Sequence, residues 1–548
     1  MIGTSTNLKL FARRHRLLRS ALCMLLGVCT TLHAPQALAQ AKPARTAFHN
    51  PILFADYSDP DIIRDGGDYY IISSSFHFVP GIPILHSKDL VHWELAGHVL
   101  PRLPFDPAYD MSGKMRYAGG VWAPSVRAHN GLFYIYFPTP DEGIFVTTAP
   151  KMTGPWSAPT EVIAGPGYED PCPFWDDDGK AYLVHSKLGA GPLILHRMAL
   201  DGKSVLDAGK VIVQDAKALP TLEGPKIYKR NGWYYIFAPM GGVGRGSQAV
   251  MRSRTIDGPY EPRIVLSQGS TDINGPHQGG YVETPDGQAW FVHFQLRDGH
   301  GRIVHLEPMR WVDDWPVMGE VLPGHTVGQP VASGAVDIPA AKANGLKIQT
   351  SDDFIGKTLS PMWEWNHNPD DSAWSLTQHP GTLRLHPQLA ADLFHARNTL
   401  TETMQDDSFT FSVKFDLRHM REGDRTGVSM FDKNLGYLGV METEGKRHLV
   451  FSARSKDTVG GAISAAGVIL RVCLLGDTAH YFYSIDEGRT FIAEGAAVPI
   501  VFSWWKGSRP SLFAFNTLKP ASPDSFVDVE WAHYAPIAER SMEACTKH

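Results

Sequence analysis

The chain has 548 residues and a mass of 60.4 kDa, which is enough for two or more domains with their own cores. Its 52 Gly and 40 Pro favour many tight turns and argue against a helix bundle or coiled coil. The net charge is −6, and without residues 1–39 it is −11, from 46 basic and 57 acidic residues. We therefore expect neither nucleic acid nor an anionic membrane surface as partner.

The N-terminus has the pattern of an export signal. Basic residues through Arg19 precede an apolar run at 21–28 and the A-x-A pattern at 37–39. The apolar run is too short for a membrane span, and no later segment has about 18 consecutive apolar residues. These features predict a signal peptide over 1–39 and a mature protein in the periplasm or outside the cell.

Three cysteines remain after the predicted signal, namely Cys172, Cys473 and Cys545. Three cysteines can form at most one disulfide and are not a disulfide framework. The pair Cys473 and Cys545 is favoured because both lie in the C-terminal part, but the sequence leaves their pairing open. No Cys and His spacing of the zinc type is present.

A hairpin signal followed by an aromatic strand recurs five times in the first 330 residues. Its glycines stand at positions 67, 131, 179, 232 and 287, mostly after Asn or Asp. Asn-Gly and Asp-Gly pairs suit two-residue turns between antiparallel strands. The intervals of 64, 48, 53 and 55 residues leave room for about four short strands each. This repeat predicts an all-β fold, a five-bladed β-propeller, with a β-sandwich of the same strands as the alternative.

The repeat also predicts where a site lies. The innermost strand of each propeller blade begins near the central axis, so residues eight to ten positions before each turn should converge. Those positions hold Asp59, Trp122, Asp170, Glu223 and His277. Three carboxylates at one mouth repel one another and lose solvation, which a purely structural core would avoid. We therefore favour a functional site over a set of ordinary exposed acids at strand starts.

Three carboxylates with aromatic neighbours suit the hydrolysis of a glycosidic bond. One acid protonates the leaving oxygen, another activates water, and a third tunes or orients them. Trp122 or Phe76 offers a sugar ring an apolar face. The sequence contains no G-x-S-x-G, P-loop, H-E-x-x-H or dinucleotide motif in the required context. The glycine-rich run 241–246 is expected to form a loop over the site.

Several runs resemble glycoside hydrolase family 43. In the first 330 residues these are NPIL (50–53), DPD (59–61), SSF (74–76), PGIPILHSKDL (80–90), VWAP (121–124), DP (170–171), EGPKIYK (223–229), GR (301–302) and WPV (315–317). Further on, DDF (352–354), WEWNHNP (363–369) and ARNTL (396–400) resemble the accessory β-sandwich of that family's xylosidases. The resemblance covers nearly the whole chain after the predicted signal, in the expected order.

The resemblance implies a five-bladed propeller that hydrolyses β-xylosides or α-L-arabinofuranosides with inversion. It assigns the general base to Asp59, the general acid to Glu223 and the third carboxylate to Asp170. Asp61 is a competing candidate for the base. Four further residues match positions that shape or contact the terminal sugar subsite: Phe76, Trp122, His277 and Arg302.

Inversion requires room for a water molecule, so the resemblance implies that Asp59 and Glu223 stand roughly 6.5–9.5 Å apart. Glu223 must hold a proton, and a like-charged neighbour such as Asp170 favours that state.

A non-catalytic sugar-binding propeller and a retaining enzyme of the fructosidase type are the alternatives to this function. We expect no required cofactor and no metal site, although a structural Ca²⁺ near His277 stays open. The expected partner is a xylo- or arabino-oligosaccharide, and the preferred sugar and the oligomeric state stay open.

The predicted domains are a signal peptide (1–39), the catalytic propeller (47–323), a linker (324–348) and a concanavalin A-like β-sandwich (349–538). The linker is rich in Gly, Ala, Val and Pro, and alternating residues such as those at 409–415 suit half-buried strands. The resemblance implies that the sandwich packs on the propeller and lends a side chain to the pocket rim. A separate sugar-binding module is the alternative.

Overall fold

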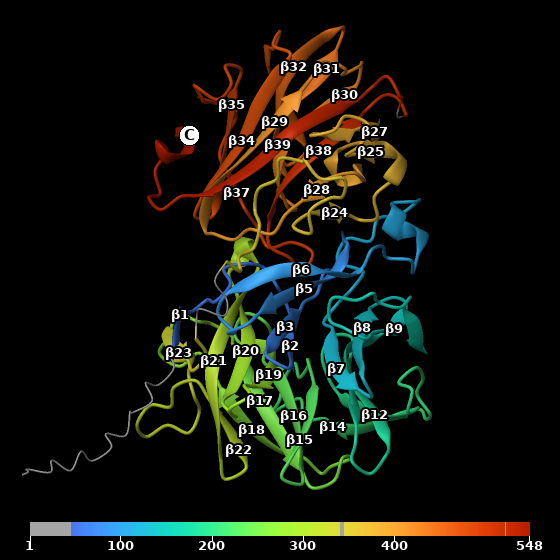
Figure 1. The fold of residues 1–548 in the computed structure, drawn as a ribbon, viewed down its shortest axis with the longest axis vertical. Helices are drawn as coiled ribbons and strands as arrows, with labels where there is room; N and C mark the ends of the chain where they lie inside the picture. Colours follow the sequence, from blue (N-terminus) through green and yellow to red (C-terminus); the bar gives the residue numbers. More distant parts are fainter. Residues whose placement is uncertain (1–44, 340–344, 521, 548) are drawn as a thin grey trace, which may run out of the picture. The chain divides into compact units, whose positions relative to one another are not determined.

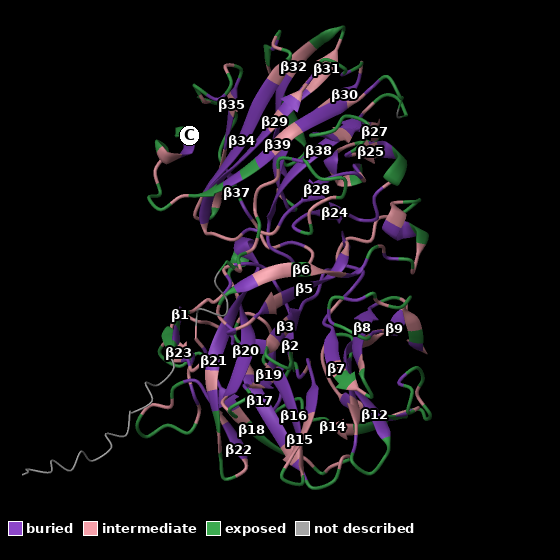
Figure 2. Ribbon diagram, in the orientation of Figure 1, coloured by how far each residue is buried: buried purple, intermediate pink, exposed green. Residues whose placement is uncertain are grey.

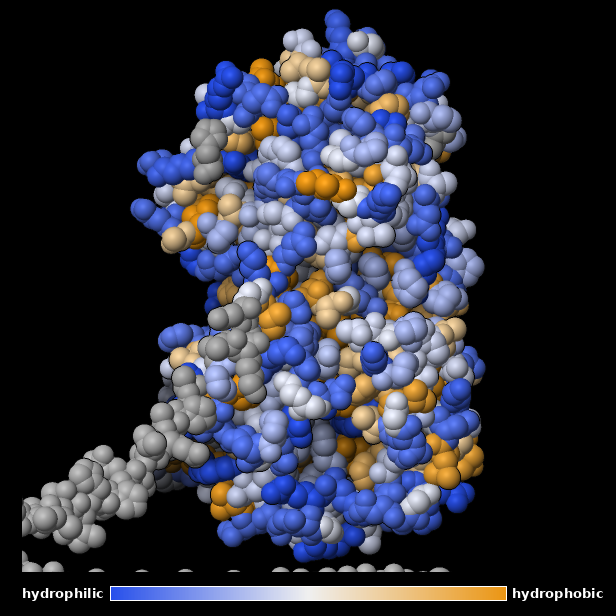
Figure 3. Space-filling view, viewed as in Figure 1, coloured by the Kyte–Doolittle hydropathy of each residue, from blue (hydrophilic) through white to orange (hydrophobic). Residues whose placement is uncertain are grey.

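The computed structural model describes residues 45–339, 345–520 and 522–547 (Figure 1). The predicted signal peptide lies outside these residues. Within them the regular elements are β-strands and short 3₁₀ helices, and no helix is long and apolar enough to cross a membrane. The face seen in Figure 3 is mainly hydrophilic, with hydrophobic residues scattered over it.

Five four-stranded antiparallel sheets form the predicted propeller, one after another along the chain (Figure 1). The first has β2 (Asp61–Asp65), β3 (Asp68–Ile72), β5 (Gly81–Ser87) and β6 (Trp93–Leu100). The second has β7 (Ser125–His129), β8 (Leu132–Thr139), β9 (Gly143–Ala149) and β10 (Thr160–Ala164). The third has β11 (Tyr168–Trp175), β12 (Ala181–Lys187), β13 (Leu193–Met198) and β14 (Lys210–Val213).

The fourth sheet has β15 (Lys226–Arg230), β16 (Trp233–Met240), β17 (Ser247–Ser253) and β18 (Glu261–Leu266). The fifth has β19 (His277–Glu283), β20 (Ala289–Leu296), β21 (Arg302–Val312) and β22 (Trp315–Met318). Each predicted turn joins the first two strands of its sheet. Asn130 and Asn231 have φ of 48° and 51° and are followed by Gly131 and Gly232 at 77° and 70°, as a type I′ turn requires.

The propeller core consists of apolar layers between neighbouring blades. Ile72 and Ile84 of the first blade pack with Ile135 of the second, and Phe237 of the fourth packs with Phe291 of the fifth. Figure 2 shows that the strands are largely buried. Because each layer is shared by two blades, the inner strand starts are held in fixed positions around the axis.

The segment expected to be a linker is partly structured. Within 324–348, β23 (Ser333–Val336) pairs with β1 (Thr46–His49), and Thr46 lies opposite Val336. Val336 and Ile338 belong to a core that they share with the first and fifth blades. Over its described residues this segment is therefore packed on the propeller rather than extended away from it.

The C-terminal part forms the predicted sandwich of two large sheets. One contains β24 (Glu364–Asn366), β27 (Gln388–Leu389), β28 (Leu400–Thr401), β30 (Asp424–Phe431), β31 (Gly436–Thr443), β32 (Lys446–Ala453), β33 (Lys456–Ala462) and β38 (Arg509–Asn516). The other contains β25 (Trp374–Ser375), β26 (Leu383–Leu385), β29 (Ser408–Asp416), β34 (Gly467–Leu475), β35 (Thr478–Ser484), β36 (Ile492–Ala493), β37 (Val498–Pro499) and β39 (Val527–Pro536). Strand β4 (Phe78–Val79), inserted in the first blade, pairs with β24 and so joins the first of these sheets. The short 3₁₀ helices are η1 (Pro107–Asp110), η2 (Asp298–His300), η4 (Asp371–Ala373), η5 (Leu393–His395) and η6 (Ala544–Thr546).

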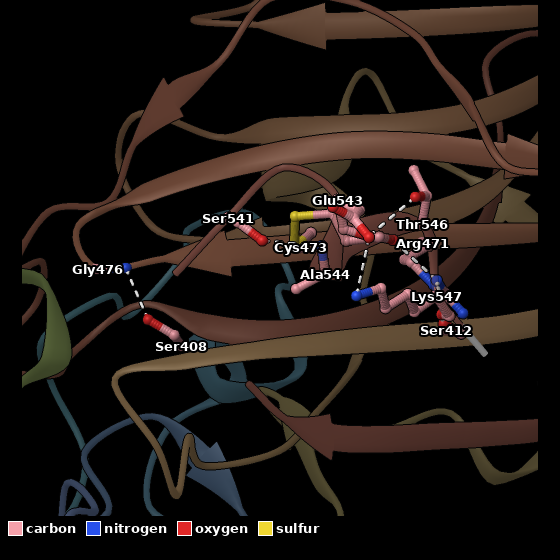
Figure 4. The surroundings of a disulfide bond; sticks show 11 residues. Ser408, Ser412, Arg471, Cys473, Gly476, Ser541, Glu543, Ala544, Thr546 and Lys547 are labelled. Carbon is pink, nitrogen blue, oxygen red and sulfur yellow. Dashed lines mark hydrogen bonds and ion pairs between the residues drawn. A yellow bond between two sulfur atoms is a disulfide. The ribbon is translucent and has the colours of Figure 1, made fainter. Parts of the chain in front are cut away.

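Cys473 and Cys545 form a disulfide, which confirms the favoured pairing (Figure 4). It ties β34 to the C-terminal segment, 72 residues further along the chain. The Arg471 guanidinium donates hydrogen bonds of 2.8 Å to the carbonyl oxygens of Cys545 and Lys547. Cys172 is a free thiol and is fully buried.

Candidate functional site

A cavity of about 430 Å³ lies where the inner strands begin. Asp59 precedes β2, Trp122 precedes β7, Asp170 lies on β11 and Glu223 precedes β15. Six of the seven residues predicted for the site line this cavity: Asp59, Phe76, Trp122, Asp170, Glu223 and Arg302. The convergence predicted from the repeat is therefore present in the fold.

Asp59 is a buried carboxylate with a cationic partner. It lies in the left-handed region at φ 53°, just before β2. Its Oδ1 accepts a hydrogen bond of 2.5 Å from Nη1 of Arg302, and its Oδ2 accepts one of 2.5 Å from the Ser74 hydroxyl. The guanidinium and the hydroxyl hold the carboxylate in one orientation, as a general base needs.

Asp61, the competing candidate for the base, does not line the cavity. Its side chain is fully buried, and its Oδ2 accepts hydrogen bonds of 2.8 Å from Arg127 Nη1 and 2.9 Å from the Val126 amide. Residues two apart on a regular strand share a face, but the left-handed backbone at Asp59 breaks that pattern. The structure therefore separates the two aspartates.

Glu223 is the more exposed acid, with 19% of its side chain accessible. Nε2 of His277 lies 3.0 Å from its Oε1, without the alignment of a hydrogen bond. The His277 ring is fully buried and does not line the cavity, so of the two roles that the resemblance implied, shaping the subsite or contacting the sugar, this position suits the first. The next residue along β19, Gln278, lines the cavity instead.

A backbone amide fixes the carboxylate of Asp170. Its Oδ2 accepts a hydrogen bond of 2.7 Å from the amide of Gly224, the residue after Glu223. Gly224 has φ 61°, and a Cβ there would come within 2.9 Å of the Gln278 side chain, so the position requires glycine. Burial raises the pKa of Asp170 well above its ordinary value, and the neighbouring carboxylates of Glu169 and Glu223 add to this effect.

Sequence reasoning missed Glu169, a fourth carboxylate that lines the cavity. Successive residues of a regular strand point to opposite faces, so Glu169 and Asp170 should diverge. The pairing of β11 with β12 shifts register between Glu169 and Cys172, and Asp170 has φ 54°. This bulge turns both carboxylates toward the cavity. Burial and the nearby Glu223 raise the pKa of Glu169 to about 7.

Aromatic side chains form another part of the wall. The rings of Phe76 and Trp122 meet edge to face at 6.1 Å, and Trp122 meets Trp505 in the same manner at 5.9 Å. Trp505 is 41% exposed and belongs to the sandwich, so this domain supplies the rim side chain that the resemblance implied. No local pattern around residue 505 indicates this contact.

The loop carrying Trp505 is anchored to the propeller by buried polar groups. Lys506 Nζ donates a hydrogen bond of 2.8 Å to the Asp56 carbonyl, and the Gly507 amide donates one of 2.7 Å to the Asp56 carboxylate. The same carboxylate accepts a bond of 3.1 Å from the Arg302 amide. Arg302 Nη2 in turn donates to the Trp505 carbonyl at 3.3 Å. One hydrogen-bond network therefore holds both the Trp505 loop at the cavity rim and Arg302, the cationic partner of Asp59.

The remaining wall comes from two loops. Leu188, Gly189 and Ala190 follow β12, and Gly242 and Val243 belong to the glycine-rich run that was expected over the site. Among the described residues, Glu169, Asp170 and Glu223 form a carboxylate group compact enough to hold a cation, with ligand oxygens within 4.8 Å of one another. The expectation that no metal is required stays a prediction.

Comparisons with known proteins show which family the chain resembles along most of its length. The family described as glycosyl hydrolases family 43 matches residues 48–316, and the β-xylosidase C-terminal concanavalin A-like domain matches residues 351–535. A β-xylosidase of Formosa agariphila is 33% identical over 540 residues, covering 88% of this chain and 90% of that protein. A non-reducing end α-L-arabinofuranosidase of Bacteroides ovatus is 31% identical over 447 residues, covering 77% and 81%. The crystal structure of the GH43 BlXynB protein from Bacillus licheniformis superposes with a TM-score of 0.79 at 27% identity, over 90% of this chain and 100% of that one.

Proposed function

Because the chain belongs to glycosyl hydrolases family 43 and is a glycoside hydrolase, we propose that it is an inverting exo-glycosidase. Its proposed substrates are plant-wall oligosaccharides that end in a β-xylosyl or an α-L-arabinofuranosyl residue. The observation that carries this proposal is the arrangement of Asp59, Asp170 and Glu223 around one cavity, each in a different electrostatic environment. Relatives named as β-xylosidase and as α-L-arabinofuranosidase support both sugars.

In the proposed mechanism, Asp59 takes a proton from the water that attacks the anomeric carbon. Arg302 and Ser74 donate hydrogen bonds to its carboxylate and fix the direction of its lone pairs. Glu223 gives a proton to the leaving oxygen, and its greater exposure suits a residue that faces the aglycone. Asp170 is a carboxyl neighbour of the acid, and it accepts a hydrogen bond from the Gly224 amide, which orients Glu223.

We attribute the proposed specificity for the sugar to side chains of the cavity wall. Phe76, Trp122 and Trp505 offer apolar faces to a sugar ring, and Arg302 offers donors to its hydroxyls. A cavity of about 430 Å³ suits a terminal sugar with part of its neighbour, which favours exo action.

Activity on 4-nitrophenyl β-D-xylopyranoside and 4-nitrophenyl α-L-arabinofuranoside, measured side by side on the purified protein, tests the substrate. Hydrolysis of neither sugar would contradict the proposed function. Proton NMR of the first product tests the mechanism, because direct attack by water produces the inverted anomer before mutarotation. Net retention would instead make Asp59 a nucleophile, as in the fructosidase-type alternative.

We also propose that the protein acts in the periplasm or outside the cell. The N-terminal signal pattern supports export, and the Cys473–Cys545 disulfide suits an oxidising compartment. Fractionation of cells that produce the full chain, with N-terminal sequencing of the mature protein, tests this. A chain retained in the cytoplasm with residues 1–39 intact would contradict it.

A further inference from the structure

Glu169 is the acidic group of the cavity that the proposed mechanism does not use. Its side chain is 5% exposed, and it accepts hydrogen bonds from the amides of Gly189 at 3.1 Å and Ala190 at 3.2 Å. Each carboxylate oxygen takes one of these bonds, so the group cannot rotate freely. The two amides belong to the cavity wall, and the carboxylate is therefore a fixed part of the site.

The charges around Glu169 are mostly of its own sign. Its nearest acidic neighbours are Asp170 and Glu223, whose oxygens lie within 4.8 Å of its own. Among the described residues no Lys or Arg forms an ion pair with any of the three. The nearby Lys and Arg side chains bond elsewhere: Lys226 bonds to Pro124 and Ser125, and Arg302 bonds to Asp59. The His277 imidazole contacts one member of the group, Glu223.

Three carboxylates so close together, without a Lys or Arg partner, repel one another when ionised, and this repulsion favours a proton on the group. Their protons are shared by the group, and removing one member changes how tightly the other two hold theirs. Burial raises the pKa of both Glu169 and Asp170, which agrees with this geometry.

We propose that Glu169 is a positioning residue whose carboxylate keeps the proton on Glu223 as the pH approaches and exceeds neutrality. This inference rests on the proposed function, in which Glu223 must be protonated to release the leaving group. Asp170 acts on the same proton from the buried side, bonded to Gly224. Glu169 acts from the wall, bonded to the loop that follows β12. The acid therefore has two carboxyl neighbours rather than one.

The test is the pH dependence of kcat/KM for Glu169→Gln and for the wild type, measured on a substrate with a poor leaving group such as xylobiose. Gln keeps the shape and one acceptor but removes the charge. We expect the alkaline limb to move to lower pH by about one pH unit, with the acidic limb in place. On an activated aryl glycoside the same variant should lose much less activity, because that leaving group needs little protonation.

Glu142→Gln is the matched control. Glu142 is a half-buried propeller glutamate whose pKa burial also raises, and it does not line the cavity. Its variant should keep the wild-type pH profile. If Glu169→Gln does not fold, Glu169→Asp is the second variant. Its side chain is one methylene group shorter, so the carboxylate lies farther from Glu223. The alkaline limb of the pH profile should then move partway in the same direction.

An unmoved alkaline limb in the folded Glu169 variant, with equal loss on both substrates at every pH, would overturn the inference and leave Glu169 a structural residue. That result is distinct from failure of the proposed function. The function fails when the wild-type protein hydrolyses neither sugar, whereas this inference fails only on an active wild-type enzyme.

Discussion

Glu169→Gln is also expected to change stability in a manner that depends on pH. Burial raises the pKa of this carboxyl from 4.5 to about 7 in the folded protein. Between these two pH values the folded chain keeps a proton that the unfolded chain has released. The free energy of unfolding contributed by Glu169 therefore falls as the pH rises from about 4.5 to about 7, and stays low above it.

The magnitude follows from the two proton affinities. Each tenfold change in proton affinity corresponds to about 1.4 kcal/mol, so an ionised Glu169 costs the folded state about 3 kcal/mol at pH 8. Gln cannot ionise, but it accepts one fewer hydrogen bond from Gly189 and Ala190, a loss of about 1 kcal/mol at every pH. We expect the variant to be about 1 kcal/mol less stable than the wild type at pH 4.5 and about 2 kcal/mol more stable at pH 8.

Urea unfolding of both proteins at pH 4.5, 6 and 8, with the disulfide intact, measures this difference. Glu161→Gln, on the exposed part of β10, is the control, and its difference from the wild type should not change with pH. A Glu169→Gln difference that is constant between pH 4.5 and 8 would refute the reasoning, because it would mean that this carboxyl ionises equally easily in the folded and unfolded chains.

Four further predictions concern the site and its support. Glu223→Gln should lower kcat by about 10²–10⁴-fold on poor leaving groups and much less on activated aryl glycosides; equal losses would remove Glu223 from the acid's role. Trp505→Ala should raise KM by about tenfold with little change in kcat, because it removes an aromatic face beside Trp122; an unchanged KM would place the sugar elsewhere. Replacing Cys473 and Cys545 together with Ser should lower the free energy of unfolding by about 2–4 kcal/mol, and a smaller loss would show that the Arg471 contacts already hold the C-terminal segment. Dialysis against EDTA should leave kcat/KM unchanged, since no step of the proposed mechanism uses a metal; a loss restored by Ca²⁺ would contradict this.

Much of the fold could be predicted from local chemistry. Glycine permits the positive φ of a tight turn whatever surrounds it, and such a glycine occurs in all five first hairpins, at Gly66 rather than Gly67 in the first, so these hairpins were predictable. The interval between turns set the number of strands per blade. The position of Asp59, Asp170 and Glu223 relative to these turns then predicted their convergence, because blades repeat around one axis.

Other features depended on contacts between distant residues. The expected linker packs as β23 on β1, a pairing between residues nearly 290 positions apart that no local pattern marks. Trp505 and Lys506 reach the site from the sandwich because Asp56 binds their loop. His277 lies at the predicted blade position, but its ring contacts Glu223 and does not line the cavity.

The sequence by itself determined the blades and the three converging acids, since turn geometry and strand periodicity are properties of short segments. Only the tertiary structure decided which carboxylates face the cavity. Asp59 and Asp170 adopt left-handed backbone conformations, which separate Asp59 from Asp61 and bring Glu169 beside Asp170. Outside tight turns, a non-glycine residue rarely adopts such a backbone unless the surrounding packing supports it, so strand alternation could not reveal the fourth acid.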